Sequence, residues 1–333
     1  MKKDETKRIS AYHTGALLWL TDLLFVLPVY WLMKRHMSTF SLTYLDGKRK
    51  QIESDFKHGA TFITNHRDII CDPAFFCFKM RLRYGIRPYM GIGNNLFKKW
   101  WIEPLVRFNR CYVVIRDGAP RDALHHATIL SRYIGHLRDN HKSIWIAQRE
   151  GRSKDCTDLT QPAVLKMLTL SEGGDFLSAV RKLNIMPVSL SYEFDPCDYL
   201  KAKEAQQRRD QRDFKKGSED DLLSMKTGMW TDKGRVVFRM TPSINHWLNR
   251  HENELRQLSR NDQIAAVAHR IDHQIHLGYE IYDRGPSFEE YLQGQLSKID
   301  LPERDDDFLL GKLHEMYNNP VMNYEKSHFP GVI

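Results

Sequence analysis

The sequence predicts an α/β fold with a largely parallel central sheet flanked by helices. Short runs of β-branched and aromatic residues alternate with longer stretches of helical pattern through the middle of the chain. This alternation is typical of units in which a helix joins two parallel strands. An N-terminal membrane-associated helix and a C-terminal helical extension complete the expected fold.

Seven segments have the pattern of strands, namely residues 39–45, 60–64, 87–92, 110–116, 143–148, 185–192 and 235–240. Helical stretches at 73–84, 119–140 and 172–183 separate several of them. Pro187 lies inside the apolar run 185–192. Because proline cannot donate a backbone hydrogen bond, we expect it at a sheet edge or a bulge. The charged stretch 199–230 is expected to form a solvated helix with mixed-sign pairs.

The N-terminal region carries a membrane-like segment at residues 16–33, between basic flanks. It is just long enough to cross a bilayer core of about 30 Å. Asp22 near its middle would cost roughly 2.5–3.5 kcal/mol on insertion, and Pro28 removes a backbone donor. We therefore expect a bent helix at the membrane interface, with aromatic rings at headgroup depth (Trp19, Tyr30 and Trp31). A buried core helix is the alternative.

Composition and charge suit a folded protein with anionic partners. The 333 residues divide into an N-terminal segment at 1–38, an α/β domain at 39–242 and a C-terminal extension at 243–333. The excess of 50 basic over 42 acidic residues favours a membrane, a nucleic acid or a phosphate as partner. No RNA-binding motif is present, so no nucleic-acid partner is expected.

The five cysteines indicate neither a disulfide framework nor a zinc site. They are scattered along the chain, odd in number and without a C-x-x-C pair. We therefore expect a reducing compartment, with no bound metal and no cofactor.

The stretch from Asn65 to Asp72 is the first candidate for chemistry. It follows the run 60–64, and the carboxyl ends of strands are where α/β sheets usually bind their ligands. His66 is then a general base oriented by Asp72 or Asp68, or else a loop histidine held by the backbone. Asp72 before Pro73 also has the pattern of a helix N-cap, with the helix beginning at residue 73.

The second candidate is the turn at 148–155, directly after the run 143–148. Glu150, Gly151, Arg152 and Ser153 place a cation, a hydroxyl and a flexible backbone at a strand end. Such a turn suits bidentate binding of a phosphate by arginine, although an ordinary polar turn has the same composition.

These motifs follow one another in an order that resembles the glycerolipid acyltransferase family, which includes the lysophosphatidic acid acyltransferases. The resemblance covers roughly residues 40–195: Asn-His with a nearby aspartate, a strand ending in Arg116, the Glu-Gly-Arg-Ser turn, and an apolar strand containing Pro187. An N-terminal membrane segment is also usual in that family.

Three departures from the family pattern indicate a divergent branch. The family separates its histidine and aspartate by four residues, but five lie between His66 and Asp72, and Cys71 occupies the family's position. The resemblance therefore points to Asp72, with Asp68 as the fallback. Only Arg116 matches the second motif, and the third lacks the threonine between Gly151 and Arg152.

The resemblance implies an O-acyltransferase that moves a fatty acyl group from acyl-CoA or an acyl carrier protein to a hydroxyl of a lysophospholipid or glycerol-phosphate acceptor. His66, Asp72 and Asp68 would be catalytic, and the acceptor would be bound by Arg116, Glu150, Gly151, Arg152, Ser153 and Pro187. The enzyme would work on the cytoplasmic face of an anionic membrane, in phospholipid biosynthesis. An N-acyl amino acid acceptor, or lipid binding without catalysis, are the alternative functions.

Overall fold

The structure, a computed structural model, describes residues 7, 9–11, 27–96, 100, 102–115 and 120–328. Within these residues, seven strands form one sheet in the order β1-β7-β6-β2-β5-β3-β4. The strands are β1 (Thr39–Tyr44), β2 (Thr61–Thr64), β3 (Tyr89–Gly93), β4 (Cys111–Val114), β5 (Ile144–Ala147), β6 (Ile185–Tyr192) and β7 (Arg235–Met240). Each of the seven predicted strands is confirmed, with small shifts at the ends.

The sheet is mostly parallel, as predicted. Strands β6, β2, β5, β3 and β4 all pair in parallel, whereas β7 pairs antiparallel with β6 and parallel with β1. The carboxyl ends of the five parallel strands therefore meet at one edge of the sheet.

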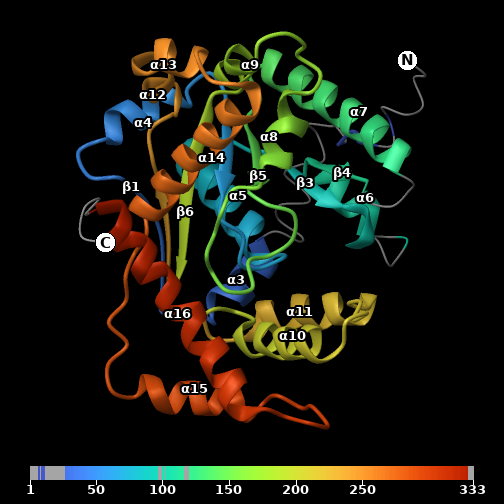
Figure 1. Cartoon of the computed structure of the whole chain (residues 1–333), viewed down its shortest axis with the longest axis vertical. Helices are drawn as coiled ribbons and strands as arrows, with labels where there is room; N and C mark the ends of the chain where they lie inside the picture. Colours follow the sequence, from blue (N-terminus) through green and yellow to red (C-terminus); the bar gives the residue numbers. More distant parts are fainter. Residues whose placement is uncertain are drawn as a thin grey trace.

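Helices flank both faces of this sheet (Figure 1). In chain order they are α3 (Leu27–Lys34), α4 (Arg49–Asp55), α5 (Cys71–Tyr84), α6 (Ile102–Phe108), α7 (Pro120–Asp139), α8 (Pro162–Thr169), α9 (Phe176–Leu183), α10 (Asp198–Asp210), α11 (Ser218–Trp230), α12 (Asn245–Arg250), α13 (Glu252–Arg256), α14 (Arg260–Leu277), α15 (Phe288–Leu296) and α16 (Asp306–His328). The predicted helices at 73–84, 119–140 and 172–183 correspond to α5, α7 and α9.

The central strands alternate their side chains between two apolar layers, as the two-residue period of a strand requires. One layer contains the helices α3, α4 and α5 with strand residues such as Phe62, Trp145 and Met186. The other contains α7, α8, α9 and α14 with Ile63, Ile144 and Ile185. Burial on both faces explains why these strands read as continuous apolar runs.

The C-terminal helices take part in two different clusters. Helix α14 packs on β6 in the main core, through residues such as Ile271 and Ile275. Helices α15 and α16 instead pack with α10 around a smaller cluster that includes Leu292 and Leu313. Figure 1 shows α10, α11 and α15 below the carboxyl end of the sheet, with α16 running down toward them.

Pro187 lies in an internal strand, so the prediction of a sheet edge or a bulge was wrong. It is buried in β6 and pairs with Ile63 of β2. The antiparallel ladder with β7 ends at the pair Val188 and Met240. The carbonyl of Pro187 points past this end and accepts hydrogen bonds from Thr241. The nitrogen and the carbonyl of a strand residue face the same neighbouring strand, which for Pro187 is β7. Since the β6–β7 ladder has already ended at this position, the absent N–H of Pro187 leaves no ladder hydrogen bond unmade.

The predicted membrane segment is described only at its end, because residues 12–26, including Trp19 and Asp22, lie outside the described residues. In α3, Trp31 is 59% exposed, whereas Tyr30 stacks on Phe78 with ring centroids 3.7 Å apart. No helix in the described part of the chain has the length and apolar character that a membrane span needs.

Asp198 is a buried carboxylate at the junction of α10, α15 and α16. Its Oδ2 accepts hydrogen bonds from the hydroxyls of Tyr291 and Tyr317, each at 2.7 Å. Burial, together with the neighbouring Asp195, raises the pKa of Asp198 to about 6. The charged form is therefore less favourable here than in the unfolded chain, where the pKa of aspartate is about 3.9.

This shift makes the junction more stable at mildly acid pH. A carboxyl whose pKa is raised by folding contributes stability below its unfolded pKa, and this contribution is lost as the pH rises through about 6. Between about pH 5 and about pH 7.5, the free energy of unfolding of wild type relative to Asp198→Asn should fall by about 1–1.5 kcal/mol. Urea unfolding at both pH values measures this, with the exposed Asp300→Asn as control. An unchanged difference would contradict it.

Candidate active site

Two strand-end loops meet at the carboxyl edge of the sheet. Asn65 and His66 follow β2, and the turn at 148–155 follows β5, the parallel neighbour of β2. The loops are joined directly, because the backbone N–H of Ser153 donates to the carbonyl of His66 at 2.8 Å. The structure therefore brings together two motifs that lie far apart in the sequence.

Asn65 fixes the start of the first loop. Its amide nitrogen donates to the carbonyl of Leu190 and to Asp158 Oδ2, each at 2.9 Å, and its oxygen accepts from the N–H of Leu190 at 2.7 Å. Since the side chain is fully buried and bonded at both atoms, it holds His66 between β6 and the second loop.

His66 and Asp72 form a hydrogen-bonded pair. The distance from His66 Nδ1 to Asp72 Oδ2 is 2.8 Å, the imidazole is 14% exposed and the carboxylate is buried. Because a carboxylate only accepts hydrogen bonds, Nδ1 carries the hydrogen of this bond and the neutral ring keeps its lone pair on Nε2. Within the described residues, Nε2 has no hydrogen-bond partner. The ring borders a large cavity, so this nitrogen is available to a ligand.

Asp72 is held rigidly by further donors. Its Oδ2 also accepts from the backbone N–H groups of Arg67 and Asp68, and its Oδ1 accepts from the hydroxyl of Tyr192 at 2.9 Å. Burial beside this carboxylate raises the pKa of Tyr192 well above its usual range, so the hydroxyl remains a donor. The carboxylate therefore orients the imidazole as one fixed element of the loop.

Asp72 is not the N-cap that the sequence suggested. Helix α5 begins at Cys71, so Asp72 and Pro73 lie in its first turn. Proline is tolerated there because the first N–H groups of a helix have no partner within it. Asp68 takes the capping role, because its Oδ1 accepts from the N–H groups of Ile70 and Cys71 at 2.9 and 2.6 Å. Asp68 makes no hydrogen bond to His66.

Cys71, at the position that the resemblance assigns to an aspartate, has the features of an unreactive thiol. Its side chain is fully buried and its sulfur donates to the carbonyl of Gly228. Burial, with the charge of Asp68 beside it, raises the pKa of this thiol well above its usual range. Since the thiolate is the reactive form of cysteine, Cys71 is unsuited to act as a nucleophile.

The turn after β5 presents its first three predicted residues to the cavity. Glu150, Gly151 and Arg152 border it together with His66. Gly151 adopts a φ of +69°, a left-handed conformation that side chains disfavour. Ser153 is buried and does not border the cavity; its hydroxyl donates to Asp155 while its N–H holds the carbonyl of His66.

Arg152 is a buried cation with spare hydrogen-bonding capacity. The residue is 6% exposed, and its guanidinium donates through Nη2 to Ser224 Oγ at 3.0 Å. Its Nη1 is buried without a hydrogen-bond partner among the described residues. Burial opposes its charge, but nearby acidic groups led by Cys197 and Asp68 outweigh burial and raise the pKa of Arg152. A permanent buried cation is therefore held beside the His66 loop.

The remaining two predicted binding residues have different outcomes. Arg116 lies outside the described residues. Pro187 is buried in the middle of β6 and does not border the cavity.

The cavity has a volume of about 930 Å³ and two kinds of wall. One part is apolar and is formed by β3, β4, β5, α6 and α8, through residues such as Ile92, Val114, Ile146, Val106 and Met167. The other part is charged and is formed by the turn after β5, by α10, by the segment before α11 and by α11 itself, through Arg152, Lys154, Glu204, Arg208, Lys216 and Asp221. A ligand with an apolar chain and an anionic head matches this division.

Helix α10 is not the solvated helix that its charge pattern suggested. Glu204 is 6% exposed, and it pairs with Lys154 at 2.5 Å and with Arg208 at 3.0 Å. Burial, reinforced by the nearby Arg152, lowers the pKa of Lys154 to about 8. The charged stretch 199–230 gave no sign that Glu204 would be buried, because a buried ion pair and a solvated one have the same composition.

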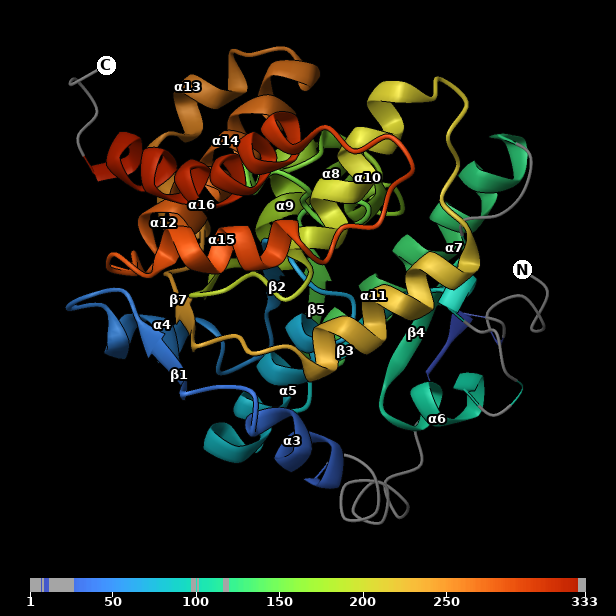
Figure 2. The same cartoon turned by 90° about the horizontal axis from the view of Figure 1, so that it is seen from below.

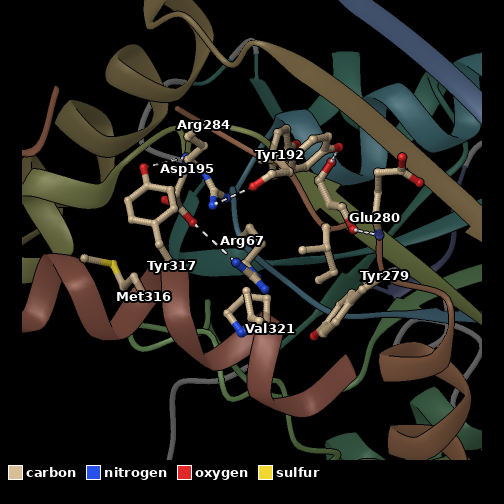
Figure 3. A pocket seen from close by; sticks show the side chains of 13 residues that line it. Arg67, Tyr192, Asp195, Tyr279, Glu280, Arg284, Met316, Tyr317 and Val321 are labelled. Carbon is tan, nitrogen blue, oxygen red and sulfur yellow. Dashed lines mark hydrogen bonds and ion pairs between the residues drawn. The ribbon is translucent and has the colours of Figure 1, made fainter. Parts of the chain in front are cut away.

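A buried ionic network holds the loop that carries His66, through its neighbour Arg67. Arg67 pairs with Asp158 at 2.5 Å, and the hydroxyl of Tyr279 donates to the same Asp158 oxygen at 2.6 Å. Figure 3 shows Arg67 and Arg284 around Asp195, next to Tyr317. The small cavity there measures about 20 Å³, enough for a single water molecule. We therefore assign this network to scaffolding.

The described residues contain no cluster of three or more histidine, cysteine or carboxylate side chains that could hold a metal ion. All five cysteines lie in the described part of the chain and are free thiols. In comparisons with known proteins, neither a family model nor a curated protein sequence matches this chain.

Proposed function

We propose that this protein is an O-acyltransferase that moves a fatty acyl group from a thioester to a hydroxyl of a lyso-lipid or glycerol-phosphate acceptor. The observation that carries the proposal is the His66–Asp72 pair at the border of a cavity with one apolar part and one charged part in which basic side chains predominate. Acyl-CoA or an acyl carrier protein would be the donor.

In the proposed reaction, His66 Nε2 removes the proton of the acceptor hydroxyl as its oxygen attacks the thioester carbonyl. The carbon–oxygen bond forms, the carbon–sulfur bond breaks, and the thiol leaves with the proton returned by the imidazolium. Asp72 keeps the ring in the required tautomer and stabilises its charged form. No covalent acyl-enzyme is needed, which agrees with the inert state of Cys71.

The charged part of the cavity supports an anionic acceptor. Arg152 offers an unpaired buried Nη1, and Lys154 adds a second cation next to it. A guanidinium binds a phosphate through two parallel hydrogen bonds, which positions the hydroxyl relative to His66. Arg116 is proposed to assist, in line with the motif to which it belongs.

The apolar part supports a fatty acyl chain. Its wall of aliphatic side chains on β3, β4, β5, α6 and α8 would bury methylene groups, each worth about 0.8 kcal/mol. The acceptor and product would reside in an anionic membrane, to which residues 16–33 would bind at the cytoplasmic face, lying on it or anchored in it. The protein would then contribute to phospholipid biosynthesis.

The direct test is to incubate purified protein with an isotope-labelled acyl thioester and a panel of acceptors, followed by mass spectrometry of the lipids. Lysophosphatidic acid, glycerol 3-phosphate, other lysophospholipids and an N-acyl amino acid belong in the panel. Formation of an ester with any of them supports the proposal. Binding of lipid without ester formation would instead identify a non-catalytic lipid-binding protein.

Arg152→Ala should weaken acceptor binding more than turnover. A hydrogen bond between charged groups contributes about 1.5–3 kcal/mol, so the KM for an anionic acceptor should rise by roughly 10- to 150-fold. The exposed Arg250→Ala, which removes the same charge on α12, is the matched control and should leave KM unchanged. If both variants behave alike in steady-state kinetics, Arg152 does not bind the acceptor.

A further inference from the structure

Helix α11 exposes an apolar outer face. Leu222, Leu223 and Trp230 are 43%, 46% and 45% exposed, and the exposed Lys226 lies between them. Residues 223, 226 and 230 follow the three- and four-residue spacing that places side chains on one side of a helix. Two adjacent exposed leucines and a tryptophan on one helix face form an apolar patch, and patches of this kind mark interaction sites.

The inner face of α11 is fixed against the candidate active site. Ser224 accepts the hydrogen bond from Arg152, and Met225 borders the cavity. Gly228 lies so close to Asp68 that a Cβ at this position would be 1.9 Å from Asp68 Oδ2. The helix is therefore held in one rotation about its axis, with its apolar outer face directed to solvent.

The end of α11 adjoins the end of α3. The N–H of Lys233 donates to the carbonyl of His36 at 2.9 Å, and the imidazole of His36 meets the ring of Trp230 with centroids 5.9 Å apart. In α3, the exposed Trp31 stacks with the guanidinium of Arg35 at 4.0 Å. Figure 2, the view from below, shows both helices on this side of the molecule.

We propose that these residues (Trp31, Arg35, Leu222, Leu223, Lys226 and Trp230), which we name the α3–α11 face, dock on an anionic membrane surface. Tryptophan and leucine enter the boundary between headgroups and acyl chains, and lysine and arginine beside them bind anionic headgroups. At the end of α11 nearest α3, the exposed cations Lys226 and Arg35 accompany the two tryptophans, which favours an anionic bilayer as the occupant, whereas the exposed Glu219 lies at the opposite end of α11. Of the residues of the α3–α11 face, only Trp31 belongs to the segment 16–33.

Docking in this orientation would place the charged part of the cavity near the membrane. Lys216, Asp221 and Met225, which border the cavity, belong to α11 or immediately precede it. A lipid could then reach the cavity from the bilayer without crossing bulk water. This consequence relies on the proposed function, whereas docking itself does not.

The test is binding of the full-length protein to phosphatidylcholine vesicles with and without phosphatidylglycerol, in the absence of any acyl donor or acceptor. Leu223→Asp should reduce the partition coefficient on anionic vesicles by about tenfold or more, since it replaces a leucine that would enter the bilayer with an aspartate that anionic headgroups repel. Leu258→Asp is the matched control: Leu258 is 41% exposed and comes two residues after α13, a helix near the top of Figure 1, whereas α11 lies in the lower part. It should bind as wild type does.

Hydrogen–deuterium exchange distinguishes docking through α11 from membrane binding through the N-terminal segment alone. When anionic vesicles are added to wild type, amides in residues 218–230 should exchange more slowly, and this protection should be lost in Leu223→Asp. Equal vesicle binding by Leu223→Asp and Leu258→Asp, or unchanged exchange in 218–230, would overturn the proposal. So would a wild-type dimer in vesicle-free solution that Leu223→Asp converts to monomer, because the face would then be a self-association surface.

Discussion

Replacing His66 with alanine is expected to lower acyl transfer by at least about 10²- to 10⁴-fold while the protein stays folded. The loss follows from removal of the base that accepts the hydroxyl proton. The fold should persist because Asp72 keeps its bonds to the N–H groups of Arg67 and Asp68 and to the hydroxyl of Tyr192. Turnover of an acyl thioester with a lyso-lipid acceptor, together with thermal unfolding, measures both parts.

The matched control for this variant is His251→Ala. His251 is a half-exposed histidine paired with Glu254, and it lies between α12 and α13, away from the cavity. It should retain wild-type turnover. Near-normal turnover by His66→Ala would assign that histidine to the alternative role, a loop residue that helps to hold the turn.

Gly228→Ala should destabilise the protein and reduce turnover. Its new methyl group would lie 1.9 Å from Asp68 Oδ2 and 2.7 Å from Asp68 Cγ. Asp68 cannot move away freely, because its Oδ1 is bonded to the N–H groups at the start of α5. Overpacking of this kind typically costs about 1–3 kcal/mol. Because the same loop carries His66 and Asp72, the displacement should also disturb their geometry.

Gly311→Ala is the control for the glycine substitution. Gly311 also lies within a helix, α16, but apart from its chain neighbours and the nearby backbone of that helix, no atom comes within 4 Å of the position that a Cβ would take. Alanine there should stabilise the protein by about 0.5–1 kcal/mol, because glycine loses more conformational freedom on folding. Urea unfolding of both variants gives the comparison. Equal effects would show that α11 does not pack on the Asp68 loop as described.

The sheet was predictable because its signal is local. Buried parallel strands read as short apolar runs, and the helices between them interrupt these runs at regular intervals. The apolar run of β6 was recognisable even with Pro187 inside it. Where Pro187 would lie in the sheet was not predictable, because it depends on where the neighbouring strand β7 ends. The order of the strands, and the antiparallel direction of β7 and β1 relative to the other five, could not be predicted, because no local sequence pattern encodes them.

The sequence predicted the loops that carry the candidate site, but not the contacts between those loops and the helices α10 and α11. Strand ends located His66 and the turn at 148–155, since parallel strands bring their carboxyl ends to one edge. The choice of Asp72 over Asp68 as the partner of His66 depended on which carboxylate caps α5, a geometric detail one or two residues in size. The contributions of Glu204 and Ser224 depend on the packing of α10 and α11 below the carboxyl end of the sheet, which no local pattern encodes.

The central claim is direct transfer of an acyl group from a thioester to a bound hydroxyl, with His66 as the base. Measuring thiol release and ester formation in the same reaction, with and without a lyso-lipid acceptor, tests it most directly. The account predicts that thiol and acylated lipid appear in equal amounts, only when the acceptor is present, and that both are lost in His66→Ala. Thiol release at full rate without an acceptor, or ester formation that survives in His66→Ala, would contradict it.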